Sequence, residues 1–143
     1  MRKFNQILLV DDDPINNFLN EEILRDLQIT NHIEVLLNGQ QALAYLRQVC
    51  QFKEAVSCPA LVLFDHFMPV MDGLEFIQAL HQIDFIPQHN AIFVLLGIHT
   101  NQADVKTFQE LGVHEFTTKP LSKEFLMDVY HKYWDENSEK RFG

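Results

Sequence analysis

Short apolar runs alternate along the chain with segments of helical periodicity. The first run, residues 7–10, is continuous, which is typical of a strand buried on both faces of a sheet. It stops at three acidic residues and a proline, where Asp13 suits the N-cap and Pro14 the first position of a helix. Apolar residues then recur at helical spacing as far as Leu27. The pattern therefore predicts a strand followed directly by a helix.

Four more pairs of strand and helix follow the first. The further strands are predicted over residues 33–37, 61–64, 92–96 and 116–118. Apolar positions mark the further helices around residues 42–46, 74–80, 105–111 and 125–133, with Asn38-Gly39 as a turn, Gly112 ending a helix and Ser122 capping the last one. Parallel strands need crossover connections, and these are right-handed. The order predicts an α/β fold, a doubly wound five-stranded parallel sheet with helices on both faces.

Length and charge limit the possible functions. The chain has 143 residues, about one domain, and 47% of them are hydrophobic, enough for a core without metal or disulfide. Eleven basic and 20 acidic residues give a formal net charge of −9, which disfavours nucleic acid as a partner. No apolar run approaches the roughly 20 residues of a membrane helix. We therefore expect neither a nucleic-acid nor a membrane partner.

The two cysteines, Cys50 and Cys58, match neither a zinc-binding spacing nor a redox C-x-x-C motif. Free thiols in a reducing cytoplasm are the expected state, because disulfides are rare in that compartment. The sequence thus predicts a cytoplasmic protein without a disulfide.

Carboxylates directly follow the first and third predicted strands. They are Asp11 and Asp12 after the first strand and Asp65 after the third. In open parallel sheets, ligands bind beyond the carboxyl ends of the strands. Three neighbouring carboxylates repel one another unless a cation neutralises them, and an oxygen-only ligand set favours Mg²⁺. Helix capping is the alternative explanation, but it accounts only for Asp13.

Three segments together resemble the receiver domain of two-component response regulators. They are Ile-Leu-Leu-Val-Asp-Asp-Asp-Pro at 7–14, Leu-Phe-Asp-His-Phe-Met-Pro-Val-Met-Asp-Gly at 63–73, and Thr-Lys-Pro at 118–120. The middle segment is the most specific, and the three occur in the expected order and spacing. The resemblance covers about residues 5–135 and implies a flavodoxin-like strand order 2-1-3-4-5. It also implies one stand-alone domain over 1–143, with a polar tail at 138–143 too short for an output domain.

The resemblance also implies a role for each site residue. Asp65 would accept a phosphoryl group from a histidine kinase or phosphotransfer protein. Asp12, Asp65 and the backbone carbonyl of Phe67 would bind Mg²⁺, and Asp11 would do so through water. Lys119, after which a cis peptide bond is expected, would contact the phosphoryl oxygens. The chain would then be a phosphorylated signalling protein in a phosphorelay, not an enzyme, with slow autodephosphorylation only.

One departure from the family pattern concerns the switch. Family members usually carry Thr or Ser at the end of the fourth strand, where this chain has Gly97, or Leu96 if the register shifts by one residue, and neither supplies a hydroxyl. Losing that hydrogen bond to a charged group costs about 1.5–3 kcal/mol, which weakens the switch. His99 or Thr100 could replace the hydroxyl if the loop folds back. Phe116 holds the position of the switch aromatic, and it could equally be plain core packing.

Residues near the acceptor are expected to tune the lifetime of the phosphoryl group. In the family, the positions of Phe67 and His99 control the access of water, so a bulky Phe67 would lengthen that lifetime. His66, directly after the acceptor, is expected at the rim of the site. Output would use the face made by the fourth helix, fifth strand and fifth helix, with an unknown downstream protein or a second copy as partner.

Alternative functions remain open at this point. A pseudo-receiver, an interaction module that has lost its switch, is favoured by Gly97. An aspartyl-phosphate phosphatase would need a second Asp two residues after the nucleophile, where this chain has Phe67. Flavin binding would need a phosphate loop rich in Gly or Ser after the first strand, but residues 11–13 are acidic.

Overall fold

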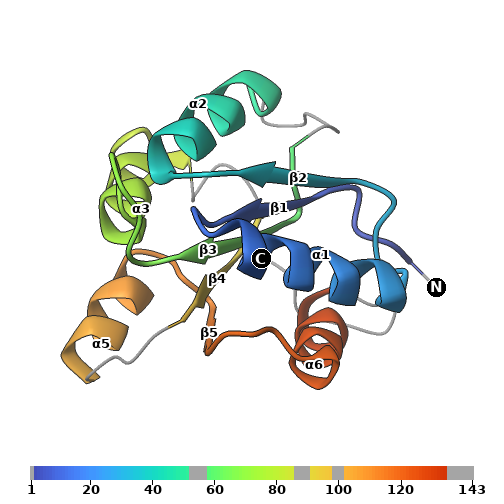
Figure 1. Cartoon of the computed structure of the whole chain (residues 1–143). Helices are drawn as coiled ribbons and strands as arrows, with labels where there is room; N and C mark the ends of the chain where they lie inside the picture. The colour runs from blue at the N-terminus through green and yellow to red at the C-terminus, as the bar shows by residue number, and fades with distance from the viewer. Residues whose placement is uncertain (1, 52–57, 86–90, 98–101, 135–143) are drawn as a thin grey trace.

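A computed structural model describes residues 2–51, 58–85, 91–97 and 102–134. Strands and helices alternate along the chain (Figure 1). The strands are β1 Ile7–Val10, β2 Ile33–Leu36, β3 Leu61–Asp65, β4 Ile92–Leu96 and β5 Glu115–Thr117. The helices are α1 Pro14–Leu27, α2 Gly39–Val49, α3 Gly73–Gln82, α5 Gln102–Glu110 and α6 Lys123–Tyr133.

The five strands form one parallel sheet in the order β2-β1-β3-β4-β5, which confirms the predicted fold. Strand β1 lies between β2 and β3, and Val10 is in register with Phe64. The first and third strands are therefore neighbours, and their carboxyl ends meet at one edge. The predicted strand bounds are right to within a residue or so, with β5 beginning at Glu115 instead of Phe116.

Helices cover both faces of the sheet. Helices α2, α3 and α5 lie on one side, and α1 and α6 lie on the other (Figure 1). Because side chains alternate along a strand, Leu8 and Val10 pack in the first layer and Ile7 and Leu9 in the second. The central strands β1, β3 and β4 are buried along their whole length, as their continuous apolar runs predict.

The helices begin at the capping residues that the sequence provides. The Asp13 carboxylate accepts the backbone N–H of Ile15 (2.9 Å), and Ser122 caps α6 as predicted. Asn38, predicted to lie in a turn, instead caps α2, whose first residue is Gly39. Within the described residues, no helix is long and apolar enough to cross a membrane.

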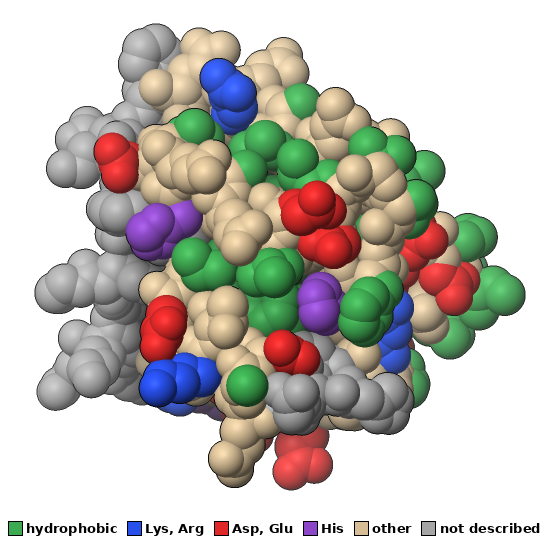
Figure 2. Space-filling view, turned by 90° about the vertical axis from the view of Figure 1, so that its left-hand side faces the viewer, with side chains coloured by type: hydrophobic (Ala, Val, Ile, Leu, Met, Phe, Trp, Pro, Cys, Tyr) green, Lys and Arg blue, Asp and Glu red, His purple; other side chains and the backbone are tan. Residues whose placement is uncertain are grey.

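Helix α1 does not bury the apolar positions of its first turns. Ile15 is 70% exposed and Phe18 is 62% exposed, whereas Asn17 and Asn20 are buried against the sheet. The periodicity thus predicts the helix correctly, but apolar residues in these turns face solvent. Figure 2 looks onto the edge at which the strands end, where apolar, acidic and histidine side chains lie side by side.

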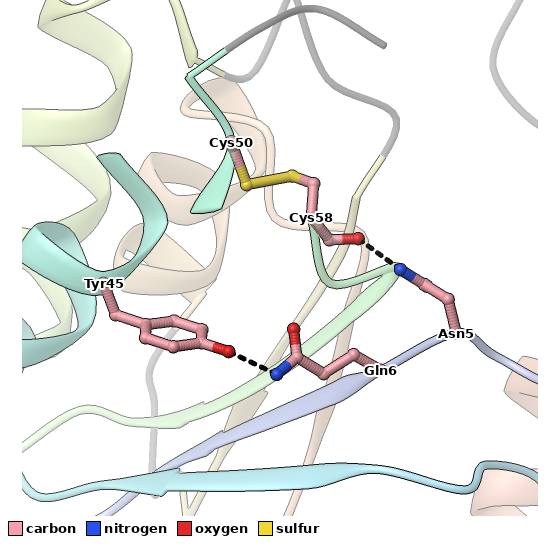
Figure 3. The surroundings of a disulfide bond; sticks show 5 residues. All are labelled: Asn5, Gln6, Tyr45, Cys50 and Cys58. Atoms are coloured by element: carbon pink, nitrogen blue, oxygen red, sulfur yellow. Dashed lines mark hydrogen bonds between the residues drawn. A yellow bond between two sulfur atoms is a disulfide. The ribbon is translucent and has the colours of Figure 1, made fainter. Parts of the chain in front are cut away.

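The opposite edge of the sheet carries a disulfide bond between Cys50 and Cys58 (Figure 3), with an S–S distance of 2.14 Å. The prediction of two free thiols is therefore wrong. Cys50 is the C-cap of α2, and the chain returns to the sheet eight residues later, so the two Cα atoms lie only 4.8 Å apart. Sequence spacing does not reveal this return. Beside the disulfide, Asn5 donates to the carbonyl of Cys58 at 2.6 Å, and Gln6 donates to the Tyr45 hydroxyl.

Candidate functional site

Three carboxylates converge at the carboxyl edge of the sheet. Asp11 and Asp12 directly follow β1, and Asp65 is the last residue of the adjacent strand β3. One carboxylate oxygen from each lies within 4.8 Å of the others. Asp11 and Asp65 are buried, whereas Asp12 is exposed at the mouth of the site. The structure thus brings together the acids that the sequence places at two strand ends.

Lys119 reaches this cluster from beyond the end of β5. Its Nζ lies 2.8 Å from Oδ2 of Asp11 and 3.0 Å from Oδ2 of Asp65. The peptide bond between Lys119 and Pro120 is cis, as expected from the resemblance. Burial lowers the pKa of Lys119, but its hydrogen bonds to Asp11 and Asp65 outweigh burial, so the pKa is raised above its usual value. The lysine is therefore a fixed cation between two carboxylates.

The carboxylate of Asp65 is held on both oxygens. Oδ2 pairs with Lys119, and Oδ1 accepts the backbone N–H of His66 at 2.8 Å. Burial raises the pKa of Asp65 above the ordinary value for an aspartate, although the hydrogen bond from Lys119 acts in the opposite direction. The buried position makes the negative charge of Asp65 unfavourable, and a bound cation would reduce this free-energy cost.

The three acids suit a hard divalent cation. Three carboxylates and one ammonium, that of Lys119, leave two formal negative charges uncompensated. The donor set is oxygen only, which is the chemistry that Mg²⁺ prefers, and Mg²⁺ commonly uses one or two carboxylates plus water. The residues present therefore fit such an ion.

A cavity of about 330 Å³ opens beside the acid cluster and is lined by Asp65, Phe67, Gly97, Thr118 and Lys119. Gly97 has φ +75°, a conformation that favours glycine. A Cβ at this position would lie 2.9 Å from Cε of Lys119 and 3.2 Å from Oδ1 of Asp65. The lysine stem therefore occupies the space next to Gly97, where the family usually has a Thr or Ser side chain.

A series of aromatic contacts extends from the residues that follow Asp65 to β5. Phe67 is 73% exposed, and its ring stacks on His66 with centroids 4.1 Å apart. His66 meets Phe108 of α5 edge to face, and Phe108 meets Phe116 of β5. Phe116 is partly buried against the core, which agrees with core packing, and its role as a switch stays a prediction. His99 and Thr100 lie outside the described residues.

Sequence reasoning missed two buried amides beneath the site. Asn17 donates from Nδ2 to the backbone carbonyl of Asp11 at 2.8 Å, and Asn20 accepts the backbone N–H of Leu121 at 3.3 Å. The available signal was their spacing of three residues on a helix that directly follows the acids. The exposed Ile15 and Phe18 hid it, because an apolar pattern suggests that apolar residues are the buried ones.

Comparisons with known proteins identify the family of this chain. The sequence profile of the response regulator receiver domain matches residues 7–131. The two-component response regulator ORR41 of Oryza sativa subsp. japonica is 31% identical over 132 residues, which cover 92% of this chain and 96% of the relative.

Solved structures share the fold. A two-component response regulator from Cytophaga hutchinsonii superposes with a TM-score of 0.79 at 28% identity, covering 92% of this chain and 97% of that one. The phosphorylated cyanobacterial phytochrome response regulator RcpA superposes with a TM-score of 0.68 at 26% identity, covering 90% and 89%.

Proposed function

Because the chain belongs to the response regulator receiver domain family, we propose that Asp65 is its phosphoacceptor and that Mg²⁺ and Lys119 assist the transfer. Receiver domains are signalling modules rather than classical enzymes, and they receive their phosphoryl group from histidine kinases or phosphotransfer proteins. The observation that carries the proposal is the arrangement around Asp65. Its carboxylate lies at a strand end, 3.0 Å from a lysine ammonium and beside two further acids.

In the proposed step, a carboxylate oxygen of Asp65 attacks the phosphorus of a phosphohistidine. The new O–P bond forms as the P–N bond of the donor breaks, and the product is an acyl phosphate. Lys119, now held between Asp11 and Asp65, is within reach of the incoming phosphoryl oxygens. The N–H of His66 holds Oδ1 of Asp65, which leaves Oδ2 as the oxygen on the side of the lysine.

The proposed Mg²⁺ ligands are Asp12, Asp65 and the backbone carbonyl of Phe67, with Asp11 acting through water. When bound, the ion offsets repulsion between the anionic nucleophile and the phosphoryl oxygens. The two uncompensated negative charges of the acid cluster support this assignment.

Exposed apolar side chains around the site support a protein as donor. Ile15 and Phe18 of α1 and Phe67 and Val70 after β3 are each more than 60% exposed. Ile15 and Phe18 lie on α1, which begins at the carboxyl edge, and Phe67 and Val70 lie in the loop after β3, which ends there. Apolar groups beside a charged cavity are the usual composition of a protein interface.

A different face is proposed for passing the signal on. It is made by α5, β5 and α6, and a downstream protein or a second copy of the chain binds there.

Gly97 gives a specific reason to keep the pseudo-receiver as a second candidate. The structure has no side chain at the position where the family usually carries a hydroxyl. A protein with this defect could bind partners without being phosphorylated. The intact acid cluster and Lys119 favour the phosphoacceptor instead.

One experiment separates the two candidates. The protein is incubated with a small phosphodonor and Mg²⁺, and its intact mass is measured. The phosphoacceptor predicts a single phosphoryl adduct that is absent in Asp65→Asn. A wild-type protein that gains no adduct under conditions where it binds Mg²⁺ would favour the pseudo-receiver.

A further inference from the structure

Two buried asparagines join the two sides of the acid cluster. Asn17 and Asn20 lie three residues apart on α1, so they share the face that packs on the sheet. Asn17 is 5% exposed and Asn20 is 1% exposed. Such depth is uncommon for a polar side chain and calls for hydrogen-bond partners.

Each amide reaches a different side of the site. Nδ2 of Asn17 donates to the backbone carbonyl of Asp11 at 2.8 Å, and so holds the acidic segment after β1. Oδ1 of Asn20 accepts the N–H of Leu121 at 3.3 Å, across 101 residues of sequence. Leu121 is two residues beyond Lys119, so this bond holds the segment that carries the lysine. One helical turn therefore fixes both segments.

Stability alone does not explain these residues. Within the described part of the chain, Oδ1 of Asn17 and Nδ2 of Asn20 are buried without a hydrogen-bond partner. Each unpaired buried polar atom costs free energy, and this cost offsets part of what the single hydrogen bond of the same amide contributes to stability. The next turn of the same face does carry an apolar residue, the fully buried Leu24.

We propose that Asn17 and Asn20 are positioning residues with separate tasks. Asn17 holds the Asp11 backbone so that the acid cluster keeps the geometry for binding Mg²⁺. Asn20 holds Leu121 so that Lys119 stays beside Asp65 and reaches the phosphoryl group. The proposal rests on the proposed function for the second task, whereas the first concerns Mg²⁺ binding alone.

The two tasks predict that matched substitutions change different quantities. Asn17→Leu is expected to raise the Kd for Mg²⁺ about tenfold, because the acids lose their backbone support. Asn20→Leu is expected to leave that Kd unchanged and to slow phosphorylation at saturating Mg²⁺ about tenfold, because the lysine is displaced. Leucine is nearly isosteric with asparagine. It leaves one backbone group unpaired but also removes one unpaired side-chain atom, so both variants should fold.

The experiment measures three quantities for the wild type and each variant. They are the Kd for Mg²⁺ by calorimetry, the phosphorylation rate with a small phosphodonor at saturating Mg²⁺, and hydrogen exchange at the Leu121 amide. Faster exchange is expected in Asn20→Leu and not in Asn17→Leu. Leu24→Ala, which truncates a buried side chain on the same face, should lower the melting temperature without moving Kd or rate. If Asn20→Leu fails to fold, Asn20→Ser keeps a shorter acceptor and should show a smaller loss of rate.

The proposal requires that one variant changes the Kd for Mg²⁺ and the other changes the phosphorylation rate. If both variants change Kd and rate together, or change neither, the two residues are structural and the positioning proposal is wrong. If the wild type itself gains no phosphoryl group, the proposed function fails. In that case the Mg²⁺ affinity of Asn17→Leu and the exchange of Leu121 still test the two hydrogen bonds.

Discussion

The two edges of the sheet are built on different principles. At the amino edge, a disulfide joins Cys50 to Cys58, Phe4 stacks on Trp134 with centroids 5.0 Å apart, and Arg2 lies 4.1 Å from the Trp134 ring centroid. At the carboxyl edge, two buried carboxylates share one lysine.

The two edges also differ in backbone conformation and in the exposure of large apolar side chains. Val70, a β-branched residue in the loop after β3, has φ +70°, a conformation that such residues rarely adopt, whereas the two left-handed residues at the amino edge, Gln28 and Asp84, are not β-branched. Phe67 and Val70 also expose large apolar surfaces there. The amino edge thus joins segments by a covalent bond and ring packing, whereas the carboxyl edge retains repulsion and exposed apolar area. Unfavourable features that gather at one place are typical of a functional site.

The largest expected effect comes from the lysine at the carboxyl edge. Lys119→Met should slow phosphorylation of Asp65 by about a hundredfold or more, the usual loss when one charge-stabilising donor is removed. Rates are measured with a small phosphodonor at saturating Mg²⁺. Lys3→Met, which removes an exposed lysine at the amino edge, should leave the rate unchanged. Equal rates for Lys119→Met and the wild type would contradict the assigned role.

Binding of Mg²⁺ should stabilise the folded protein. At a concentration of 100 times Kd, a ligand that binds only the native state adds about 2.7 kcal/mol to the free energy of unfolding. We expect Asp12→Asn to lose most of this gain, because Asp12 is exposed and its replacement leaves the core intact. Asp84→Asn, a similar change at the amino edge, should keep it. The check is urea unfolding with and without Mg²⁺.

Reducing the disulfide should affect stability and leave the site unchanged. The bond closes a segment with a sequence separation of eight, for which chain entropy predicts a loss of about 2.5 kcal/mol on reduction. Denaturant unfolding with and without reductant measures the loss, and a Cys50→Ser/Cys58→Ser double variant serves as the check. Mg²⁺ affinity should stay the same, and a parallel fall in that affinity would show that the two edges are coupled.

Phe67 is expected to slow hydrolysis of the acyl phosphate. Its ring lines the cavity, so Phe67→Asn should admit water and shorten the phosphoryl lifetime roughly two- to fivefold, a change of under about 1 kcal/mol in the barrier. Val70→Asn is the matched control, because Val70 is equally exposed in the same loop and does not line the cavity. Equal phosphoryl lifetimes for the wild type and Phe67→Asn would contradict the claim that Phe67 slows hydrolysis.

The smallest effect concerns the acidity of Asp65. Because burial raises its pKa above 3.8, the carboxyl should titrate above that value in metal-free protein, measured by carbon NMR. Lys119→Met should raise the pKa further, since the lysine lowers it. The native state then binds this proton more tightly than the unfolded state does. Its stabilising contribution is complete below pH 3.8 and is lost as pH rises through the native pKa. A midpoint at or below 3.8 would contradict the assignment.

The sequence predicts most of the fold because its local signals agree. Continuous apolar runs give the three central strands, and Asp13 and Ser122 begin helices where expected. The acids at two strand ends follow from topology, because neighbouring parallel strands end at one edge. The predictions are wrong or incomplete where tertiary contacts determine which residues pair or become buried. The pairing of Cys50 with Cys58 depends on the return of the chain after α2, and the burial of Asn17 depends on a backbone carbonyl that no sequence pattern displays.

The central claim is that an aspartate at the carboxyl edge, and none at the amino edge, accepts a phosphoryl group. Intact mass after incubation with a small phosphodonor and Mg²⁺ tests it on three proteins: wild type, Asp65→Asn and Asp84→Asn. We predict one adduct on the wild type and on Asp84→Asn, and none on Asp65→Asn. An adduct that persists in Asp65→Asn, or its absence from all three, would contradict the account.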